Sequence, residues 1–228
     1  MDLPPDAQVA DLGCGTGAGS RLLRDEFGFA VTGFDLSAEN VAWASTNHPA
    51  ANCCGPLSDG PGQLEFRQAN VLQLPVANAS FDGLLLECVF SLLPDAVAAL
   101  EEFRRVLKPG GVIGLSDMSI EGELPAGLAE KVAPWTCLLN ARSENAYREQ
   151  FERAGFEVAD CSDESAGLVE LLRTLQRKLL TLSTGAVLGE KLPVDFDLAE
   201  VVRLLRAFQA EVDRGTIRYL RFELRMKD

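Results

Sequence analysis

Histidine is almost absent from this sequence, which has a single one, His48, among its 228 residues. No uninterrupted apolar run approaches the roughly 18 residues that a membrane-spanning helix needs, and residues 1 to 6 hold no basic region followed by an apolar one. Basic residues are also few, since 21 Lys and Arg stand against 34 Asp and Glu, a formal net charge of −13. We therefore expect a cytoplasmic protein with no membrane span and no nucleic-acid partner, because a polyanion would be repelled.

The cysteines do not form a metal-binding pattern. Their spacing is not that of a paired zinc knuckle, and the single histidine further disfavours zinc, so we expect no metal site. In a reducing compartment they should remain free thiols. The hydrophobic fraction, 47%, is enough for a sizeable core. The six cysteines are Cys14, Cys53, Cys54, Cys88, Cys137 and Cys161.

Strand-like and helix-like stretches alternate through the first 160 residues, which predicts an α/β protein with a mostly parallel sheet. Residues 47–63, rich in Pro, Gly and Asn, read as a surface loop. Strands are expected at 9–12, 30–34, 64–69, 82–86, 112–115 and 156–161. Between the strands we expect four helices. The first is at 17–27, with Leu22, Leu23 and Phe27 facing inward, and the second is capped by Ser37. The third is opened by Pro94 and has Val97, Leu100, Phe103 and Leu107 on one side, and the fourth is capped by Ser143.

The pattern changes after residue 164. One apolar stripe of leucines, at positions 168, 171, 172, 175 and 179, predicts a long helix, and a second helix should begin at Asp197 and stop at Gly215. The last segment alternates apolar and polar residues, which is typical of a half-exposed strand. We expect a core at 1–164, a helical insertion at 165–215 that forms either a lid or a homodimer surface, and a final core strand at 216–228.

The stretch "VADLGCGTGAG", residues 9–19, carries the strongest functional signal. A glycine-rich turn between a first strand and its helix lets backbone N–H groups approach a ligand, most often a nucleotide or another anion. Asp35, near the end of the second predicted strand, is placed to hold a ribose. The turn alone does not separate a dehydrogenase from other nucleotide-binding proteins.

Four segments together resemble the class I S-adenosylmethionine-dependent methyltransferases. They are "DLGCGTG" at 11–17, "GFDLS" at 33–37, the segment 66–95, and "EEFRRVLKPGGVIGLSD" at 101–117. The resemblance covers roughly residues 5–160. It implies a Rossmann-like seven-stranded sheet with an antiparallel last strand, S-adenosylmethionine as cofactor with S-adenosylhomocysteine as product, and a small-molecule methyl acceptor.

The resemblance also implies roles for individual residues. Asp11 would hold the amino group of the cofactor and Asp35 both ribose hydroxyls, since a carboxylate suits a bidentate contact. Asn70 stands where the family usually has an acid, so it should accept from the adenine amine without charge assistance and bind more weakly. The full set of expected cofactor contacts is Asp11, Gly13, Cys14, Gly15, Thr16, Gly17, Asp35, Leu36, Asn70, Val71, Glu87 and Cys88, with Leu36 and Val71 around the adenine and Glu87 and Cys88 at the methionine end.

One departure from the family concerns the beginning of the chain. Members commonly have a helical segment before the first strand, whereas here only residues 1–8 precede it. Three explanations stay open: an unusually open cofactor site, an insertion that serves as the lid, or a truncated form.

Methyl transfer is an in-line displacement that can rest on proximity and orientation. Many relatives place histidines after the fourth strand, where this sequence has Ser91 and Leu92, and His48 lies in the predicted loop. We therefore expect transfer without a histidine base, to an acceptor such as a thiolate, an amine, an enolate or a soft lone pair. Glu87 and Cys137 are the candidate catalytic residues.

Two other functions stay open at this point. Residues 137–158, "CLLNARSENAYREQFERAGFEV", resemble arsenite methyltransferase-like proteins, in which Cys137 would contact a thiophilic acceptor with Cys53, Cys54 or Cys161 as companions. Cys14 and Cys88 are otherwise expected as small packing residues. The other alternative is a non-catalytic protein of this fold that binds a partner chain through its leucine-rich insertion.

Overall fold

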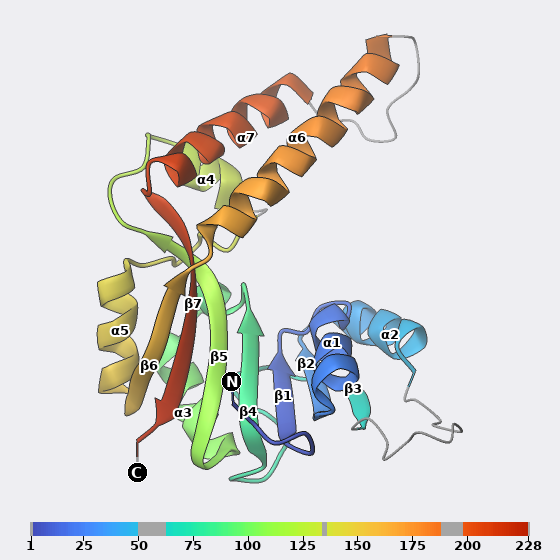
Figure 1. The fold of residues 1–228 in the computed structure, drawn as a ribbon, viewed down its shortest axis with the longest axis vertical. Helices are drawn as coiled ribbons and strands as arrows, with labels where there is room; N and C mark the ends of the chain where they lie inside the picture. Colours follow the sequence, from blue (N-terminus) through green and yellow to red (C-terminus); the bar gives the residue numbers. More distant parts are fainter. Residues whose placement is uncertain (1, 50–62, 134–135, 188–197, 228) are drawn as a thin grey trace.

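The computed structural model describes residues 2–49, 63–133, 136–187 and 198–227. Its described strands form one sheet in the order β3-β2-β1-β4-β5-β7-β6 (Figure 1). The neighbours among β1 to β5 pair in parallel, and β7 is antiparallel to both β5 and β6, as predicted. The strands are β1 Gln8–Leu12, β2 Ala30–Asp35, β3 Leu64–Gln68, β4 Phe81–Glu87, β5 Leu107–Ile120, β6 Phe156–Asp163 and β7 Ile217–Met226.

The helices begin where short polar side chains cap them. The Ser37 side chain accepts from the Asn40 N–H and that of Ser143 from the Ala146 N–H, as predicted. Asp95 rather than Pro94 caps the next helix, because its carboxylate accepts from two N–H groups of the first turn. The helices are α1 Ala18–Phe27, α2 Ala38–Asn47, α3 Ala96–Val106, α4 Leu128–Val132, α5 Glu144–Arg153, α6 Ser165–Val187 and α7 Leu198–Asp213, with a short 3₁₀ turn at Phe90–Leu92.

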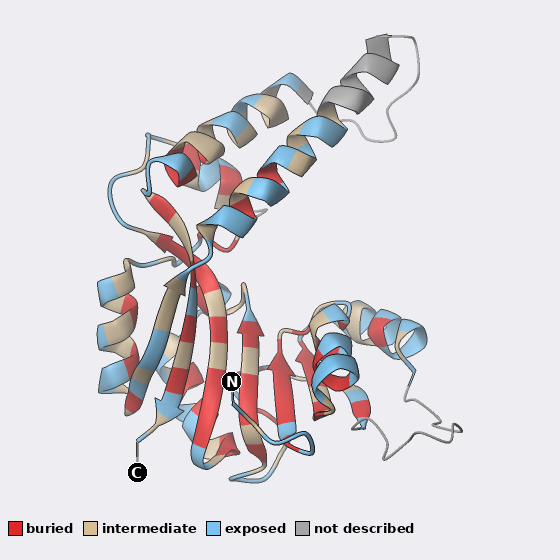
Figure 2. Cartoon of the chain, in the orientation of Figure 1, coloured by how far each residue is buried: buried red, intermediate tan, exposed pale blue. Residues whose placement is uncertain are grey.

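Apolar layers cover both faces of the sheet. Along β1, Val9 belongs to the apolar cluster that includes Leu23 of α1, whereas its neighbour Ala10 belongs to the cluster that includes Phe103 of α3 and Phe151 of α5. Successive strand residues point to opposite faces, so α1 lies on one face and α3 and α5 on the other. Figure 2 shows the buried residues concentrated in the central strands. The carboxyl ends of β1 and β4 thus lie between two helical layers, with the strand order reversing at this point.

Three side chains predicted to face the core are exposed. Leu22, Phe27 and Val97 keep 55%, 52% and 62% of their surface accessible. Each helix touches the sheet along a narrower stripe than the sequence pattern suggested, which Leu23 fills in α1. Single exposed apolar residues of this kind are ordinary in folded proteins.

The insertion of α6 and α7 precedes the last strand, as predicted, and stands beyond the end of the sheet at which β4 terminates (Figure 1). Its leucine stripe does not pack evenly: Leu168 and Leu172 are buried, whereas Leu171 and Leu175 are exposed. Asp197, the expected start of α7, lies outside the described residues, and α7 ends before Gly215, whose φ is 75°. No described helix is both long and apolar enough to cross a membrane.

Candidate active site

The turn after β1 needs glycine for two different reasons. Gly15 and Gly17 both have positive φ, 53° and 78°. A Cβ on Gly17 would lie 2.6 Å from the Phe66 ring, so this glycine permits close packing. A Cβ on Gly15 would meet no atom within 4 Å, so Gly15 faces open space. The turn therefore leaves a backbone surface to which a ligand can come close.

Asp35, at the end of β2, fixes this turn. One carboxylate oxygen accepts from the Gly15 N–H at 2.8 Å, and the other accepts from the Ser37 N–H at 2.8 Å and the Asn40 amide at 3.2 Å. The residue is 9% exposed. A carboxylate has about four lone-pair sites, so these three bonds leave acceptor capacity on the exposed side.

Asp11 and Glu87 end neighbouring strands and face the same helix. A Cβ built on Gly19, in the first turn of α1, would lie 2.9 Å from Glu87 Oε2 and 3.4 Å from Asp11 Oδ2. Asp11 is buried and accepts from the Ser20 hydroxyl at 2.5 Å. Burial raises the pKa of Asp11 to about 6 against the lowering effect of Ser20, and the charge of Glu87 raises it further. No Lys or Arg side chain in the described residues pairs with either carboxylate.

The residues expected around an adenine ring differ in exposure. Leu36 is 71% exposed and offers a free apolar surface, whereas Val71 lies almost entirely in the core. Asn70 is exposed, and its Oδ1 accepts from the Leu72 N–H at 3.0 Å. Its amide oxygen therefore has one lone pair left for a ligand.

Thr16 and Cys14 flank the turn differently. Thr16 is exposed. Cys14 is buried, with its Sγ 3.0 Å from the position that a Cβ on Gly33 would take. Burial raises the pKa of Cys14 to about 12, with Asp11 and Asp35 adding to the effect. Cys14 is thus a packing residue beneath the turn.

Cys88 follows β4 in an unusual conformation and meets Cys137. Its φ of 54° is in the left-handed region, where a non-glycine residue is uncommon. Its thiol lies 3.7 Å from the Tyr219 hydroxyl of β7, which donates to Ser116 at 2.8 Å. The neighbouring Cys137 thiol lowers the pKa of Cys88, while Cys88 and burial raise the pKa of Cys137. Cys88 packs against the apolar cluster that contains Cys137, so two free thiols are neighbours here.

Asp117, in the last part of β5, lies close to this pair and is fully buried. Its carboxylate accepts from the Ser91 N–H at 2.7 Å, the Ser91 hydroxyl at 2.8 Å and the Met118 N–H at 2.8 Å. Burial outweighs these bonds, so the pKa of Asp117 is raised. Sequence analysis did not single out Asp117 or Tyr219. For Asp117, the one available signal in the sequence was an acid that follows the apolar run of a predicted buried strand.

The other sequence candidates lie elsewhere. His48 stacks edge-on against Trp43 and lies near Phe66, on the α2 side of the glycine turn. Cys161, in β6, has Glu144 and Arg148 as neighbours, and burial raises its pKa to about 11. Cys53 and Cys54 lie outside the described residues. Among the described residues no three His, Cys, Asp or Glu side chains are grouped to hold a metal ion.

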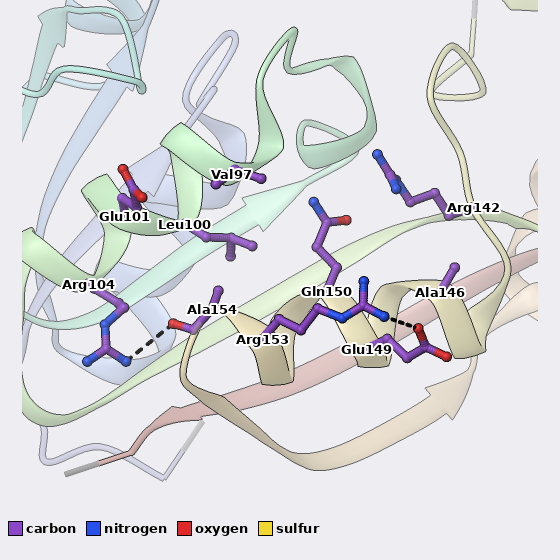
Figure 3. Close-up of a pocket in the computed structure, with 10 residues that line it drawn as sticks. All are labelled: Val97, Leu100, Glu101, Arg104, Arg142, Ala146, Glu149, Gln150, Arg153 and Ala154. Carbon is purple, nitrogen blue, oxygen red and sulfur yellow. Dashed lines mark hydrogen bonds and ion pairs between the residues drawn. The ribbon is translucent and has the colours of Figure 1, made fainter.

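A separate hollow of about 550 Å³ lies between α3 and α5 (Figure 3). Arg104 donates to the Ala154 carbonyl at 3.3 Å across it, and Arg153 pairs with Glu149 at 2.7 Å. None of the sequence-predicted site residues lines this hollow. The chemistry-bearing residues instead gather at the carboxyl ends of β1, β2, β4 and β5.

Comparison with known proteins agrees with this geometry. The methyltransferase domain family matches residues 10–115. An O-methyltransferase of Pyrenophora dematioidea is 28% identical over 191 residues, 82% of this chain and 67% of that protein. An arsenite methyltransferase of Halobacterium salinarum is 27% identical over 172 residues, 73% of this chain and 42% of that protein.

A solved structure shares the fold. It is phosphoethanolamine N-methyltransferase 2 of Haemonchus contortus with S-adenosylhomocysteine bound, which matches with a TM-score of 0.76 and 17% identity. The match covers 99% of this chain and 50% of that chain. The fold is that of the class I S-adenosylmethionine-dependent methyltransferases, and the chain resembles these enzymes in sequence. It is an S-adenosylmethionine-dependent methyltransferase enzyme, with S-adenosylmethionine as its methyl donor.

Proposed function

We propose that the chain transfers a methyl group, without a histidine base, to an acceptor bound at the ends of β4 and β5. The Asp11–Glu87 pair carries the proposal. Two carboxylates that face one point, one of them buried, repel each other unless a cation lies between them. The ammonium group of the methionine part of the cofactor supplies that cation.

The remaining cofactor contacts follow from the same placement. Asp35 holds the ribose with its free acceptor sites, and the adenine lies on Leu36. Asn70 contributes one neutral acceptor, so binding is weaker than with a carboxylate there. The methyl group then points toward Glu87 and Cys88, next to the hydroxyls of Tyr219 and Ser116.

The acceptor atom we propose is an oxygen of an acidic hydroxyl group, a phenol or an enol. The relatives named O-methyltransferases support oxygen, and the position of His48 beside Trp43 leaves the acceptor to ionise by itself. The chain then contributes proximity, in-line orientation and exclusion of water.

Calorimetry with S-adenosylhomocysteine tests cofactor binding. We expect binding by the wild type and loss of most affinity in Asp35→Ala. No binding, or identical titrations of both proteins, would contradict the proposal. Transfer of a labelled methyl group to a panel of phenols, enols and aliphatic alcohols tests the acceptor class. Equal transfer to the alcohols would show that the chain supplies a base.

A second candidate acceptor is trivalent arsenic, which the contact between Cys88 and Cys137 favours. Trivalent arsenic is thiophilic, and two adjacent thiols can displace two hydroxides from arsenite as water. The companion of Cys137 is then Cys88 rather than Cys161, which lies in β6 away from the pair. The similarity to arsenite methyltransferases supports the same assignment.

Native mass spectrometry of arsenite adducts tests this candidate. We expect Cys88→Ser and Cys137→Ser each to abolish the adduct and Cys161→Ser to leave it. Adducts that persist in both single variants would remove arsenic as the acceptor.

A further inference from the structure

A cavity of about 480 Å³ lies between α6, α7 and α4, beyond the end of the sheet. All of its described lining side chains except those of Thr136 and Lys178 are apolar. Leu171 and Leu175, two of the lining residues, are 55% and 39% exposed, so the cavity wall is accessible to a ligand. The volume is within the usual range of small-molecule sites, roughly 300 to 1,000 Å³.

The cavity is elongated along α6. Leu168 and Leu179 both line it, and the helical rise between these two residues corresponds to about 16 Å. From the opposite side Leu204 and Phe208 of α7 close it. An occupant must therefore be long and lipophilic rather than compact and polar.

One end of the cavity adjoins the proposed acceptor site. Met118 lines the cavity and follows Asp117, and Thr136 lines it and precedes Cys137. Met118 and Cys137 belong to one apolar cluster, against which Cys88 and Tyr219 pack. A molecule lying in the cavity would thus reach the methyl group of the cofactor with its inner end.

Lys178 marks the other end. It carries the only charge among the described side chains that line the cavity. A lysine stem covers apolar surface while its ammonium group stays in water. In a chain of net charge −13, this local cation favours an anionic group at the outer end of the ligand.

We propose that this cavity holds the body of the methyl acceptor, an elongated lipophilic molecule with an anionic group near Lys178. The assignment rests on the proposed function, because it places the inner end of this molecule at the transfer site. It commits to a ligand rather than to a second copy of the chain, since the apolar surface is concave and leads to the Cys88–Cys137 pair.

Displacement of the fluorescent acid cis-parinarate by dodecanoate, with 1-dodecanol as an uncharged analogue, tests the proposal. Leu175→Glu places a carboxylate in the cavity wall. Gln176→Glu is the matched control, since it adds the same group to α6 at a residue that does not line the cavity. Lys178→Gln removes the cation. Calorimetry with S-adenosylhomocysteine on every variant reports separately on the cofactor site.

We expect dodecanoate to displace the probe from the wild type and from Gln176→Glu alike. Leu175→Glu should weaken dodecanoate at least about tenfold, because its carboxylate is desolvated by the ligand. Lys178→Gln should weaken the binding of dodecanoate and leave the binding of dodecanol unchanged. S-adenosylhomocysteine binding should be the same in all four proteins.

Three results would overturn the proposal: no displacement in the wild type, equal affinity in Leu175→Glu, or a dimer that Leu175→Glu dissociates in the absence of any ligand binding. An equal effect of Lys178→Gln on the binding of dodecanoate and dodecanol would contradict the proposed anionic group of the ligand. If the wild type does not bind S-adenosylhomocysteine, the proposed function is refuted. If it binds S-adenosylhomocysteine but not dodecanoate, only this inference is refuted.

Discussion

The backbone N–H of Gly15 donates to the carboxylate of Asp35 at 2.8 Å, which joins the turn after β1 to the end of β2. The residue that we propose to hold the cofactor ribose therefore also shapes the loop on which we propose that the cofactor lies. On this proposal, cofactor affinity and loop geometry depend on the same side chain.

Asp35→Asn should weaken S-adenosylhomocysteine binding about tenfold to a hundredfold, because hydrogen bonds to a charged acceptor contribute about 1.5 to 3 kcal/mol. The amide keeps the size of the side chain and one acceptor oxygen, so the protein should still fold. Calorimetry measures the change. Glu65→Gln, which alters an exposed carboxylate of β3, is the control and should bind like the wild type.

Alanine substitutions at three glycines of positive φ can distinguish a glycine needed for packing from one needed for ligand contact. Gly110→Ala, with no atom near the new methyl group, should cost only the left-handed strain, about 1 to 2 kcal/mol. Gly17→Ala should cost about 1 to 3 kcal/mol more because of the Phe66 ring. Gly15→Ala should match Gly110→Ala in stability yet lose at least about tenfold in S-adenosylhomocysteine affinity. Urea unfolding measures the stability of each variant, and calorimetry measures its affinity for S-adenosylhomocysteine. Unchanged affinity in Gly15→Ala would show that the ligand binds elsewhere.

Asp11 should make cofactor binding depend on pH. Its pKa is raised to about 6 in the free protein, so the group binds a proton more tightly when folded, and its contribution to stability falls as pH rises from about 3.8 to about 6. A bound ammonium group favours the ionised carboxylate. The affinity for S-adenosylhomocysteine should therefore rise through pH 6, and Asp11→Asn should flatten that rise. The same slope in both proteins would show that Asp11 does not contact the ligand.

The Cys88–Cys137 contact predicts the order of thiol alkylation. Cys88 has a lowered pKa and is half-buried, whereas Cys14 and Cys137 are buried with raised pKa values. Because the thiolate is the nucleophile, iodoacetamide should modify Cys88 before these two. Cys137→Ala should slow the modification of Cys88, because it removes the neighbouring thiol that lowers the pKa of Cys88. Peptide mass spectrometry over time gives the rates, and faster labelling of Cys14 would contradict the assignment.

Local sequence patterns were sufficient for most of the secondary structure. Ser37 and Ser143 cap helices because a hydroxyl satisfies N–H groups within three residues of it, a contact that needs no knowledge of the rest of the chain. Leu22 and Val97 were misplaced because helical spacing marks a broad apolar side, whereas the sheet covers only part of it. Leu171 and Leu175 are exposed for another reason: they line the open cavity between α6 and α7.

By itself the sequence determined the alternation of strands and helices, the glycine turn, and the acids that end β1 and β2, since each depends on neighbours along the chain. Only the tertiary structure decided that Cys88 meets Cys137, that Asp117 binds Ser91, and that α6 and α7 enclose a cavity. Those contacts join residues far apart in sequence, and strand order, which no local pattern encodes, brings them together.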